Sequence, residues 1–309
     1  MINNLKLKNL ISIKDLKKSD IINILELASK YERNSIQVNK LKGKVIATAF
    51  YEPSTRTRLS FESAISKLGG EVIGFSDSSS TSVKKGETLK DTIMMLSNYS
   101  DLIVLRHPNE GAARFASEVS NVPVINAGDG SNQHPTQTLL DLYSIKKTQK
   151  KLTGLNITFV GDLKYGRTVH SLVLALIKFN CKFTFVAPKQ LPIPSSIKLE
   201  LKNNNVEFQE ITSLEKGIEC ADIVYMTRIQ KERFLDPIEY EGVKNSYILT
   251  KELVARGKEN LKIMHPLPRV NEIDIEVDKD PKAYYFKQSE NGIYVRQAII
   301  SLLIGETRK

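Results

Sequence analysis

The chain has 309 residues, a net charge of +10 from 45 basic and 35 acidic side chains, and 41% hydrophobic residues. That length favours about two domains and allows a large core that needs no disulfide or structural metal. No apolar run approaches the roughly 20 residues of a membrane-spanning helix, and no secretory signal is visible. The two cysteines, Cys181 and Cys220, form no CxxC motif, which favours a reducing, cytoplasmic location.

The positive charge could serve nucleic acid, a membrane surface or small anions. The lysines are scattered among acidic residues, and no run of five or six basic residues occurs. This pattern is typical of a solvated, Lys-rich surface. We therefore expect no nucleic-acid or membrane partner. A nucleic-acid-binding protein stays open as an alternative, and it would show binding with a steep salt dependence.

Short apolar segments alternate with amphipathic ones along the first half of the chain. We predict helices over 54–68, 88–99 and 110–119, with a further helix beginning near Pro135. The strands that they connect are predicted at 44–50, 71–75, 101–106 and 122–128.

The second half repeats this alternation, with strands predicted at 156–162, 182–188, 221–227 and 261–267. Strands of this kind, separated by helices, predict an α/β fold of two domains, each a parallel sheet flanked by helices. We place the boundary between the two domains near residue 150, which gives a first domain at 1–150 and a second at 151–288. The segment 289–309 is expected to form a helix that returns to the first domain.

Ligands of open α/β sheets bind at the carboxyl ends of strands. Ser54-Thr55-Arg56-Thr57-Arg58 follows the first strand, with Ser54 as the expected N-cap of a helix. Backbone N–H groups, hydroxyls and a guanidinium would converge there, which suits a phosphate dianion. The alternative is a capping motif beside surface arginines.

Other strand ends carry further cations and amides. Arg106 ends the third strand, while His134 and Gln137 stand at the start of the helix at Pro135. The loop before Arg167 lacks GxGxxG spacing, which argues against a dinucleotide oxidoreductase and leaves Arg167 as a carboxylate ligand. Arg228 follows a later strand, with Lys231 and Arg233 close behind it.

His265 opens a proline-rich turn whose carbonyls could hold an amide, although a buried structural role for His265 is an alternative. Taken together, these strand ends contain many cationic donors but no carboxylate pair, metal cluster or Ser-His-Asp arrangement. Such groups stabilise anions and a developing oxyanion without supplying a covalent nucleophile. We therefore expect multiply anionic substrates, one of which carries its own nucleophile.

Three segments resemble the signature motifs of the aspartate/ornithine carbamoyltransferase family: Ser54–Arg58, His134–Gln137 and His265–Pro268. Three further segments, 81–89, 161–171 and 228–234, resemble its aspartate-specific members, and the likeness extends over essentially the whole chain. The resemblance implies transfer of a carbamoyl group from carbamoyl phosphate to L-aspartate, the committed step of pyrimidine biosynthesis, without a cofactor or metal. It also implies a homotrimer with shared sites, and it allows for a regulatory chain that would give a dodecamer.

The resemblance makes 1–150 the carbamoyl-phosphate-binding domain and 151–288 the aspartate-binding domain, and it assigns roles residue by residue. Thr57, Arg106 and His134 would be catalytic, facing the carbonyl oxygen. Carbamoyl phosphate would be bound by Ser54, Thr55, Arg56, Thr57, Arg106, His134, Gln137, Pro266 and Leu267. L-Aspartate would be bound by Lys85, Arg167, Arg228, Gln230, Leu267 and Pro268. Ser82 and Lys85 would come from the adjacent subunit, although the sequence leaves open whether Thr81 takes the place of Ser82.

The resemblance also implies a mechanism in which the amine of aspartate attacks the carbonyl carbon and phosphate leaves. The segments 76–86 and 229–244 are the expected lids. Ornithine is the alternative second substrate. An ornithine enzyme needs an acidic partner for a cationic side chain, and that branch carries a cysteine where this chain has Pro266.

Overall fold

The computed structural model of the chain describes residues 7–36, 39–77, 81–230, 234 and 236–305. It consists of two compact units. Unit 1 contains the residues up to Tyr143 and those from Glu290 onward, and unit 2 contains Ser144–Ser289. None of the helices formed by the described residues is long and apolar enough to cross a membrane.

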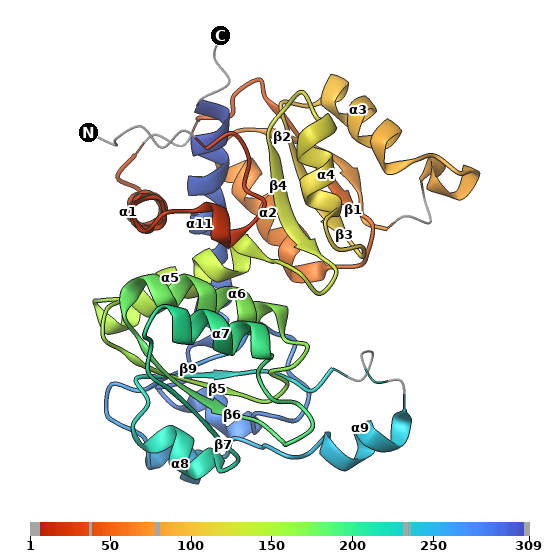
Figure 1. The fold of residues 1–309 in the computed structure, drawn as a ribbon. Coiled ribbons are helices and arrows are strands. Elements are labelled where there is room, and N and C mark those ends of the chain that lie inside the picture. Colours follow the sequence, from red (N-terminus) through yellow and green to blue (C-terminus); the bar gives the residue numbers. More distant parts are fainter. Residues whose placement is uncertain (1–6, 37–38, 78–80, 231–233, 235, 306–309) are drawn as a thin grey trace. The chain divides into compact units, whose positions relative to one another are not determined.

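Unit 1 is built on a parallel four-stranded sheet in the order β2-β1-β3-β4 (Figure 1). The strands are β1 (Val45–Phe50), β2 (Glu71–Phe75), β3 (Leu102–His107) and β4 (Val124–Asp129). The helices are η1 (Ile13–Asp15), α1 (Lys18–Glu32), α2 (Thr55–Lys67), η3 (Ser82–Lys85), α3 (Leu89–Tyr99) and α4 (Ala112–Val119). Two long helices belong partly to this unit, α5 (Pro135–Gln149) and α11 (Tyr285–Gly305).

The apolar pattern explains why the sheet of unit 1 lies inside helices. Five of the six residues of β1 are buried, as expected for a central strand of a parallel sheet. Side chains of α3 and α4, including Ile93 and Ala116, pack with β1 and β3 in one core cluster. The part of α11 in unit 1 contacts α1 through Tyr31 and Ser301, whose oxygens lie 2.6 Å apart. The prediction that the C-terminal helix returns to the first domain is therefore confirmed.

Unit 2 is a parallel five-stranded sheet in the order β7-β6-β5-β8-β9. The strands are β5 (Asn156–Val160), β6 (Lys182–Val186), β7 (Phe208–Ile211), β8 (Ile223–Met226) and β9 (Lys262–Met264). The helices are α6 (Arg167–Leu176), η4 (Ile177–Phe179), α7 (Ser195–Asn203), α8 (Leu214–Glu219), α9 (Pro237–Val243), α10 (Lys251–Ala255) and η6 (Ile275–Lys279). Figure 1 shows α6 and α7 over one face of this sheet and α8 over the other, so the predicted α/β architecture is confirmed.

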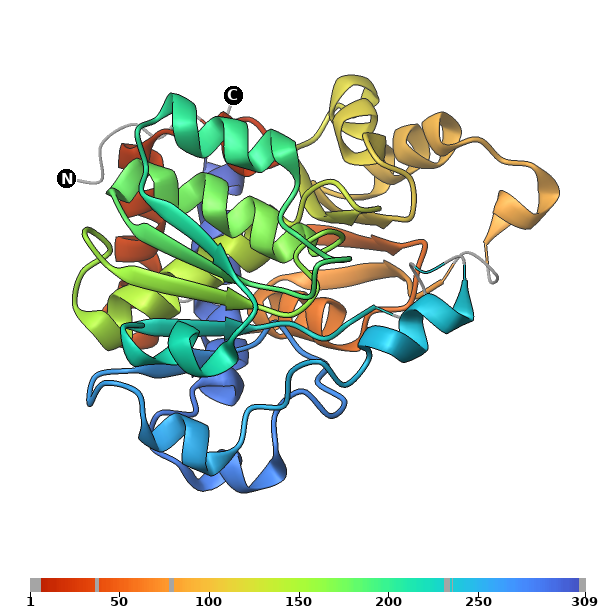
Figure 2. The same cartoon turned by 60° about the horizontal axis from the view of Figure 1, so that its bottom comes forward.

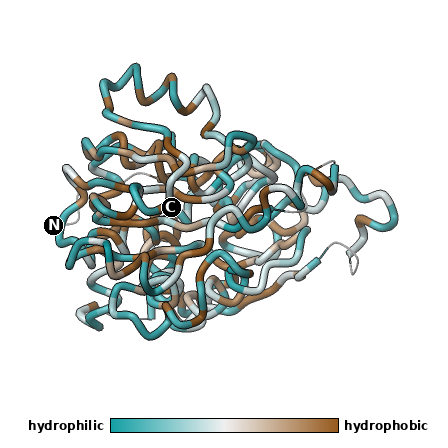
Figure 3. The backbone as a smooth tube through the Cα atoms, turned by 90° about the horizontal axis from the view of Figure 1, so that it is seen from below, coloured by the Kyte–Doolittle hydropathy of each residue, from teal (hydrophilic) through white to brown (hydrophobic). Residues whose placement is uncertain are grey.

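Apolar and hydrophilic segments alternate along the chain of each unit (Figure 3). The edge strand β7 departs from this rule, because Gln209 and Glu210 in its middle are exposed. The sequence analysis did not predict β7. Its four residues offer neither a long apolar run nor a regular alternation, so pairing with β6 decides its conformation.

Candidate functional site

In each sheet, the strands that follow the first strand in sequence are added on both sides of it, so the strand order reverses there. In unit 1, β1 lies between β2 and β3, and in unit 2, β5 lies between β6 and β8. Ligands of open α/β sheets bind at such switch points, outside the carboxyl ends of the strands. The residues that the sequence analysis singled out follow these strands in both units.

The start of α2 is the candidate anion site of unit 1. Ser54 occupies the N-cap position, as predicted, but its side chain makes no capping hydrogen bond to the helix. Thr55 and Arg56 of the first turn are exposed. The backbone N–H groups of a first helical turn have no partner within their helix and carry partial positive charge. A phosphate would therefore meet these donors, the Ser54 hydroxyl and the Arg56 guanidinium together.

Arg106 lies beside this helix start because β3 pairs with β1. Its backbone is in register with Phe50, and its carbonyl accepts a hydrogen bond of 2.9 Å from the N–H of Tyr51. Its guanidinium lies 2.7 Å from a carboxylate oxygen of Glu52 and donates to the carbonyl of Ala127 at 3.4 Å. Burial lowers the pKa of Arg106, whereas the charge and hydrogen bond of Glu52 raise it. These contacts orient the cation at the carboxyl end of the sheet.

Thr57 and His134 meet at the same place. The hydroxyl of Thr57, on α2, lies 3.5 Å from Nε2 of His134, directly before α5, and both side chains are buried. The loop that leads to His134 is held by Asp129, a residue that the sequence analysis missed. The carboxylate of Asp129 accepts hydrogen bonds from the backbone N–H groups of Gly111 and Gln133 and from the side chains of Asn126 and Asn132.

Gln137 lies in the first turn of α5, and its amide nitrogen donates to Asp141 at 2.9 Å. Ser82 and Lys85, by contrast, belong to η3 and are exposed. The orange segment that contains η3 projects from unit 1 beyond α3 (Figures 1 and 2), away from the start of α2. Thr81 caps η3, since its hydroxyl accepts from the N–H of Val83 at 3.4 Å. Residues 78–80, within the expected lid at 76–86, lie outside the described part of the chain.

Unit 2 places Arg167, Arg228 and Gln230 at the carboxyl ends of β5 and β8. Val160 and Met226 are paired at these ends, so the two following loops run side by side. Gly161 has a φ of +114°, and a Cβ atom there would lie 2.2 Å from the carbonyl oxygen of Thr227. Only glycine therefore allows the two loops to approach this closely.

Asp162 ties the two loops together. Its carboxylate accepts from the N–H of Tyr165 at 2.9 Å and from the N–H of Gln230 at 3.5 Å. The Gln230 side chain returns a hydrogen bond of 3.3 Å to the Tyr165 carbonyl. Burial raises the pKa of Asp162, although these backbone hydrogen bonds oppose the shift. The sequence analysis did not assign this role to Asp162.

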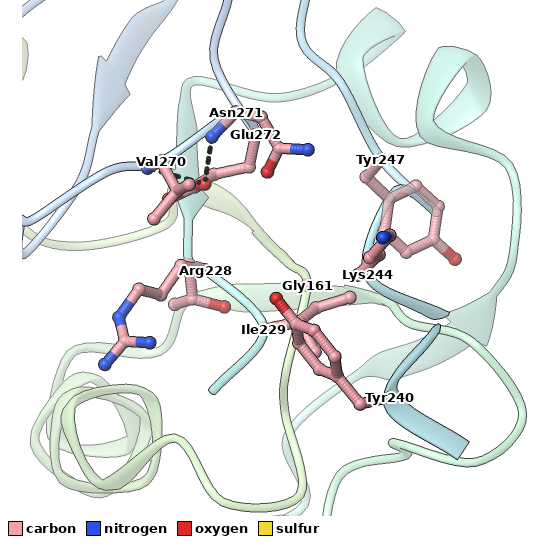
Figure 4. Close-up of a pocket in the computed structure, with 10 residues that line it drawn as sticks. Gly161, Arg228, Ile229, Tyr240, Lys244, Tyr247, Val270, Asn271 and Glu272 are labelled. Atoms are coloured by element: carbon pink, nitrogen blue, oxygen red, sulfur yellow. Dashed lines mark hydrogen bonds between the residues drawn. The ribbon is translucent and has the colours of Figure 1, made fainter. Parts of the chain in front are cut away.

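A small pocket of about 40 Å³ adjoins Arg228 (Figure 4). Tyr240 of α9 and Tyr247 line one part of it, and Val270, Asn271 and Glu272 line another. The volume has room for a few water molecules. Figure 4 shows the guanidinium of Arg228 directed away from both tyrosines. Lys231 and Arg233, in the expected lid at 229–244, lie outside the described residues.

The turn after β9 is held by His265 and Glu272. Nδ1 of His265 accepts from the N–H of Leu267 at 2.7 Å, so the ring hydrogen is on Nε2, which lies 2.7 Å from Glu272. The second oxygen of Glu272 accepts from the N–H groups of Val270 and Asn271. His265 thus has the structural role considered from sequence, and it fixes the backbone of Pro266, Leu267 and Pro268.

The fold and these candidate sites define a class of protein: two α/β units, each with cationic side chains and a helix N-terminus at the carboxyl ends of its strands, an arrangement suited to small anions. The family model "Aspartate/ornithine carbamoyltransferase, carbamoyl-P binding domain" matches residues 8–147. The model "Aspartate/ornithine carbamoyltransferase, Asp/Orn binding domain" matches residues 153–303. The chain therefore belongs to the aspartate/ornithine carbamoyltransferase family.

Relatives of known name agree with this assignment. The aspartate carbamoyltransferase catalytic subunit of Parabacteroides distasonis is 58% identical over 97% of this chain and 98% of its own length. The solved catalytic subunit of aspartate transcarbamoylase from M. jannaschii is 57% identical, with a TM-score of 0.91 over 97% of this chain and 99% of that one. The enzyme of Trypanosoma cruzi, solved with N-(phosphonacetyl)-L-aspartic acid, is 37% identical, with a TM-score of 0.91 over 97% and 96% of the two chains.

Proposed function

We propose that the chain transfers the carbamoyl group of carbamoyl phosphate to the amino group of L-aspartate, giving N-carbamoyl-L-aspartate and phosphate. The observation that carries the proposal is the contact of Thr57 with His134 near the start of α2, with Arg106 on β3, the strand paired with β1. Such a cluster provides donors for a phosphate and for a carbonyl oxygen at one place. The Trypanosoma cruzi relative was also solved with carbamoyl aspartate and phosphate, the two products of this reaction.

In the proposed reaction the uncharged amine of aspartate attacks the carbonyl carbon of carbamoyl phosphate. The new C–N bond pushes the carbonyl electrons onto oxygen, where Thr57, Arg106 and His134 stabilise the negative charge. Preorganised donors of this kind contribute about 2.7–4 kcal/mol each. The bond from carbon to the bridging phosphate oxygen then breaks, and the phosphate leaves with the electron pair and takes the proton released by the amine. Ser54, Thr55, Arg56 and the N-terminus of α2 stabilise the departing dianion.

The second substrate is aspartate because the proposed site offers cations to its carboxylates. Arg167 begins α6, and Arg228 and Gln230 follow β8. Among the described residues that line the pocket of Figure 4, Glu272 is the one carboxylate, and His265 and two backbone N–H groups occupy its oxygens. It is therefore committed to the turn and poorly suited to bind the ammonium of ornithine. The carbonyls of Pro266 and Leu267 hold the carbamoyl amide with Gln137 in this proposal, and Leu267 and Pro268 contact aspartate.

The direct test is an assay of the purified chain with carbamoyl phosphate and either aspartate or ornithine, scored for the ureido product. We expect product with aspartate. Turnover of ornithine alone would overturn the proposal.

The active form is proposed to be a homotrimer in which Ser82 and Lys85 serve a neighbouring subunit. The projection of η3 beyond α3 supports this arrangement. Variants Arg56→Ala and Lys85→Ala should each be inactive, yet mixed trimers would contain sites with neither substitution. Random mixing in equal amounts should restore roughly a quarter of wild-type activity. Mixtures that stay inactive after dissociation and reassembly would show that one subunit supplies both residues.

The same assembly could include a regulatory chain, since the matched relatives are named catalytic subunits. We also propose a cytoplasmic location. The thiols of Cys181 and Cys220 are both unpaired, as expected in a reducing compartment.

A further inference from the structure

The amide of Gln137 has a fixed orientation. Its nitrogen Nε2 donates to Asp141 Oδ1 at 2.9 Å, one turn further along α5. An ionised carboxylate accepts hydrogen bonds and cannot donate them, so the nitrogen arm of the amide must face Asp141. The carbonyl arm of Gln137 then faces away from Asp141. An amide in water shows no such preference, because its two arms exchange by a half-turn about χ3.

Asp141 is completely buried, and a buried carboxylate stays ionised only with a compensating charge. Arg296 of α11 supplies that charge, and its side chain is itself almost completely buried. Burial lowers the pKa of Arg296 to about 10, while the charge of Asp141 raises it. Arg296 therefore remains a cation at neutral pH.

Arg296 also packs against α2, which begins at the proposed substrate site as α5 does. It donates to the hydroxyl of Ser60 on α2 at 3.0 Å, and its guanidinium lies 4.9 Å from the ring centre of Phe61. Gly292, one turn earlier on α11, provides the space, since a Cβ atom there would lie 2.3 Å from Nη1 of Arg296. The cation is thus built into the packing of α2 and α11.

We propose that Asp141, kept ionised by Arg296, is a positioning residue that presents the carbonyl oxygen of Gln137 to the –NH2 group of the substrate. Asp141 thereby determines the preference of the site for a carbamoyl group over an acyl group of the same size. This inference rests on the proposed function, in which Gln137 holds the amide of carbamoyl phosphate.

Acetyl phosphate is the appropriate probe, because it replaces the –NH2 of carbamoyl phosphate with a methyl group of similar size. A site that is built to accept hydrogen bonds from a substrate discriminates strongly against an analogue without donors. In Asp141→Asn, the Arg296 cation draws the amide oxygen of Asn toward itself, which turns the amide nitrogen toward Gln137. Gln137 must then reverse and present its own –NH2 to the substrate –NH2.

The experiment measures the KM for carbamoyl phosphate and the inhibition constant of acetyl phosphate in wild type and Asp141→Asn. The KM should rise about tenfold, while the acetyl phosphate constant changes less than about threefold. Asp222→Asn is the matched control. Like Asp141, Asp222 is a hydrogen-bonded carboxylate, but it lies in unit 2. It accepts from the Lys258 ammonium and from the backbone N–H of Asn156. Asp222→Asn should lower Tm without changing the preference for carbamoyl phosphate over acetyl phosphate.

A charge-preserving double variant keeps the test decisive if Asp141→Asn fails to fold. Gln137→Glu with Asp141→Asn moves the carboxylate to the substrate side, where it accepts from the carbamoyl –NH2, and it keeps the total charge of the region unchanged. Any repulsion of the phosphate affects both ligands equally, so the preference should return to within about threefold of wild type.

An unchanged preference in folded Asp141→Asn, or a preference lost in the folded double variant, would overturn the inference. Failure of the proposed function is distinguishable, because it would appear as a wild-type chain that makes no carbamoyl aspartate.

Discussion

The two units hold their proposed sites in different ways. In unit 1, the donors come largely from secondary structure: the first turn of α2, the end of β3 and the start of α5. In unit 2, side chains hold the loops, because Asp162 joins the segments after β5 and β8 and Glu272 fixes the turn after β9. The site in unit 1 depends mainly on the side chains at these starts, with Asp129 and Asp141 as supports behind them. The site in unit 2 depends more widely on residues that never touch the ligand.

The largest effect should follow loss of a ligand-facing cation in unit 1. Arg56→Ala should lower kcat by roughly 10²–10³-fold, because the dianion loses its guanidinium. Arg56 is exposed, so Tm should not change. Arg58→Ala is the matched control on the same helix, since Arg58 pairs with Glu62 at 3.5 Å. A loss below tenfold for Arg56→Ala would mean that the backbone donors of α2 suffice without it.

The corresponding cation in unit 2 should act on the other substrate. Arg228→Gln should raise the KM for aspartate by about 10–100-fold and leave the KM for carbamoyl phosphate unchanged, because one charged hydrogen-bond donor to a carboxylate is lost. Arg256→Gln provides a control, since Arg256 is exposed and lies 3.4 Å from Glu215. Equal effects on the KM values of both substrates would contradict the assignment of carbamoyl phosphate to unit 1 and aspartate to unit 2.

A residue that only tethers loops should have a smaller effect. Asp162→Asn keeps the size of the side chain but weakens its hydrogen bonds to the N–H groups of Tyr165 and Gln230. The KM for aspartate should rise up to about tenfold, measured at saturating carbamoyl phosphate. An unchanged KM with a lowered Tm would make Asp162 a stabilising residue only.

The smallest effect should come from protonation of Glu272, in unit 2, at low pH. Burial raises the pKa of Glu272, but its hydrogen bonds from His265 and the backbone outweigh this effect, and the pKa lies below its usual value of 4.5. The stability that Glu272 contributes is therefore complete above about pH 4.5 and is lost as the pH falls through the lowered pKa. The Tm of Glu272→Gln should therefore fall less than that of wild type between pH 5 and 3. Each unit by which a pKa is shifted represents about 1.4 kcal/mol of stability. An identical pH profile would rule out this contribution.

Much of the fold could be predicted from local patterns. The buried strands β1, β3 and β5 and the helix after Ser54 were recognisable because their apolar periodicity is strong. Edge strand β7 was not, since its exposed residues leave pairing with β6 to specify it.

The candidate ligand residues were also recognisable, because cationic and polar side chains directly after parallel strands lie where open α/β sheets bind their ligands. Asp129, Asp162 and Asp141 carried no such signal. Each is a lone carboxylate that accepts from donors three or four residues away but whose role depends on a distant partner brought close by folding. These distant partners are Gly111 for Asp129, Gln230 for Asp162 and Arg296 for Asp141.

The sequence by itself therefore determined the class of fold, the family and the candidate substrate residues, because these depend on periodicity and on short motifs. Only the tertiary structure decided how those residues are oriented. The buried pair of Asp141 and Arg296 lies on two helices far apart in the chain, and packing alone brings their charges together. The orientation of a side chain depends on such contacts, whereas its chemical character follows from the residue type alone.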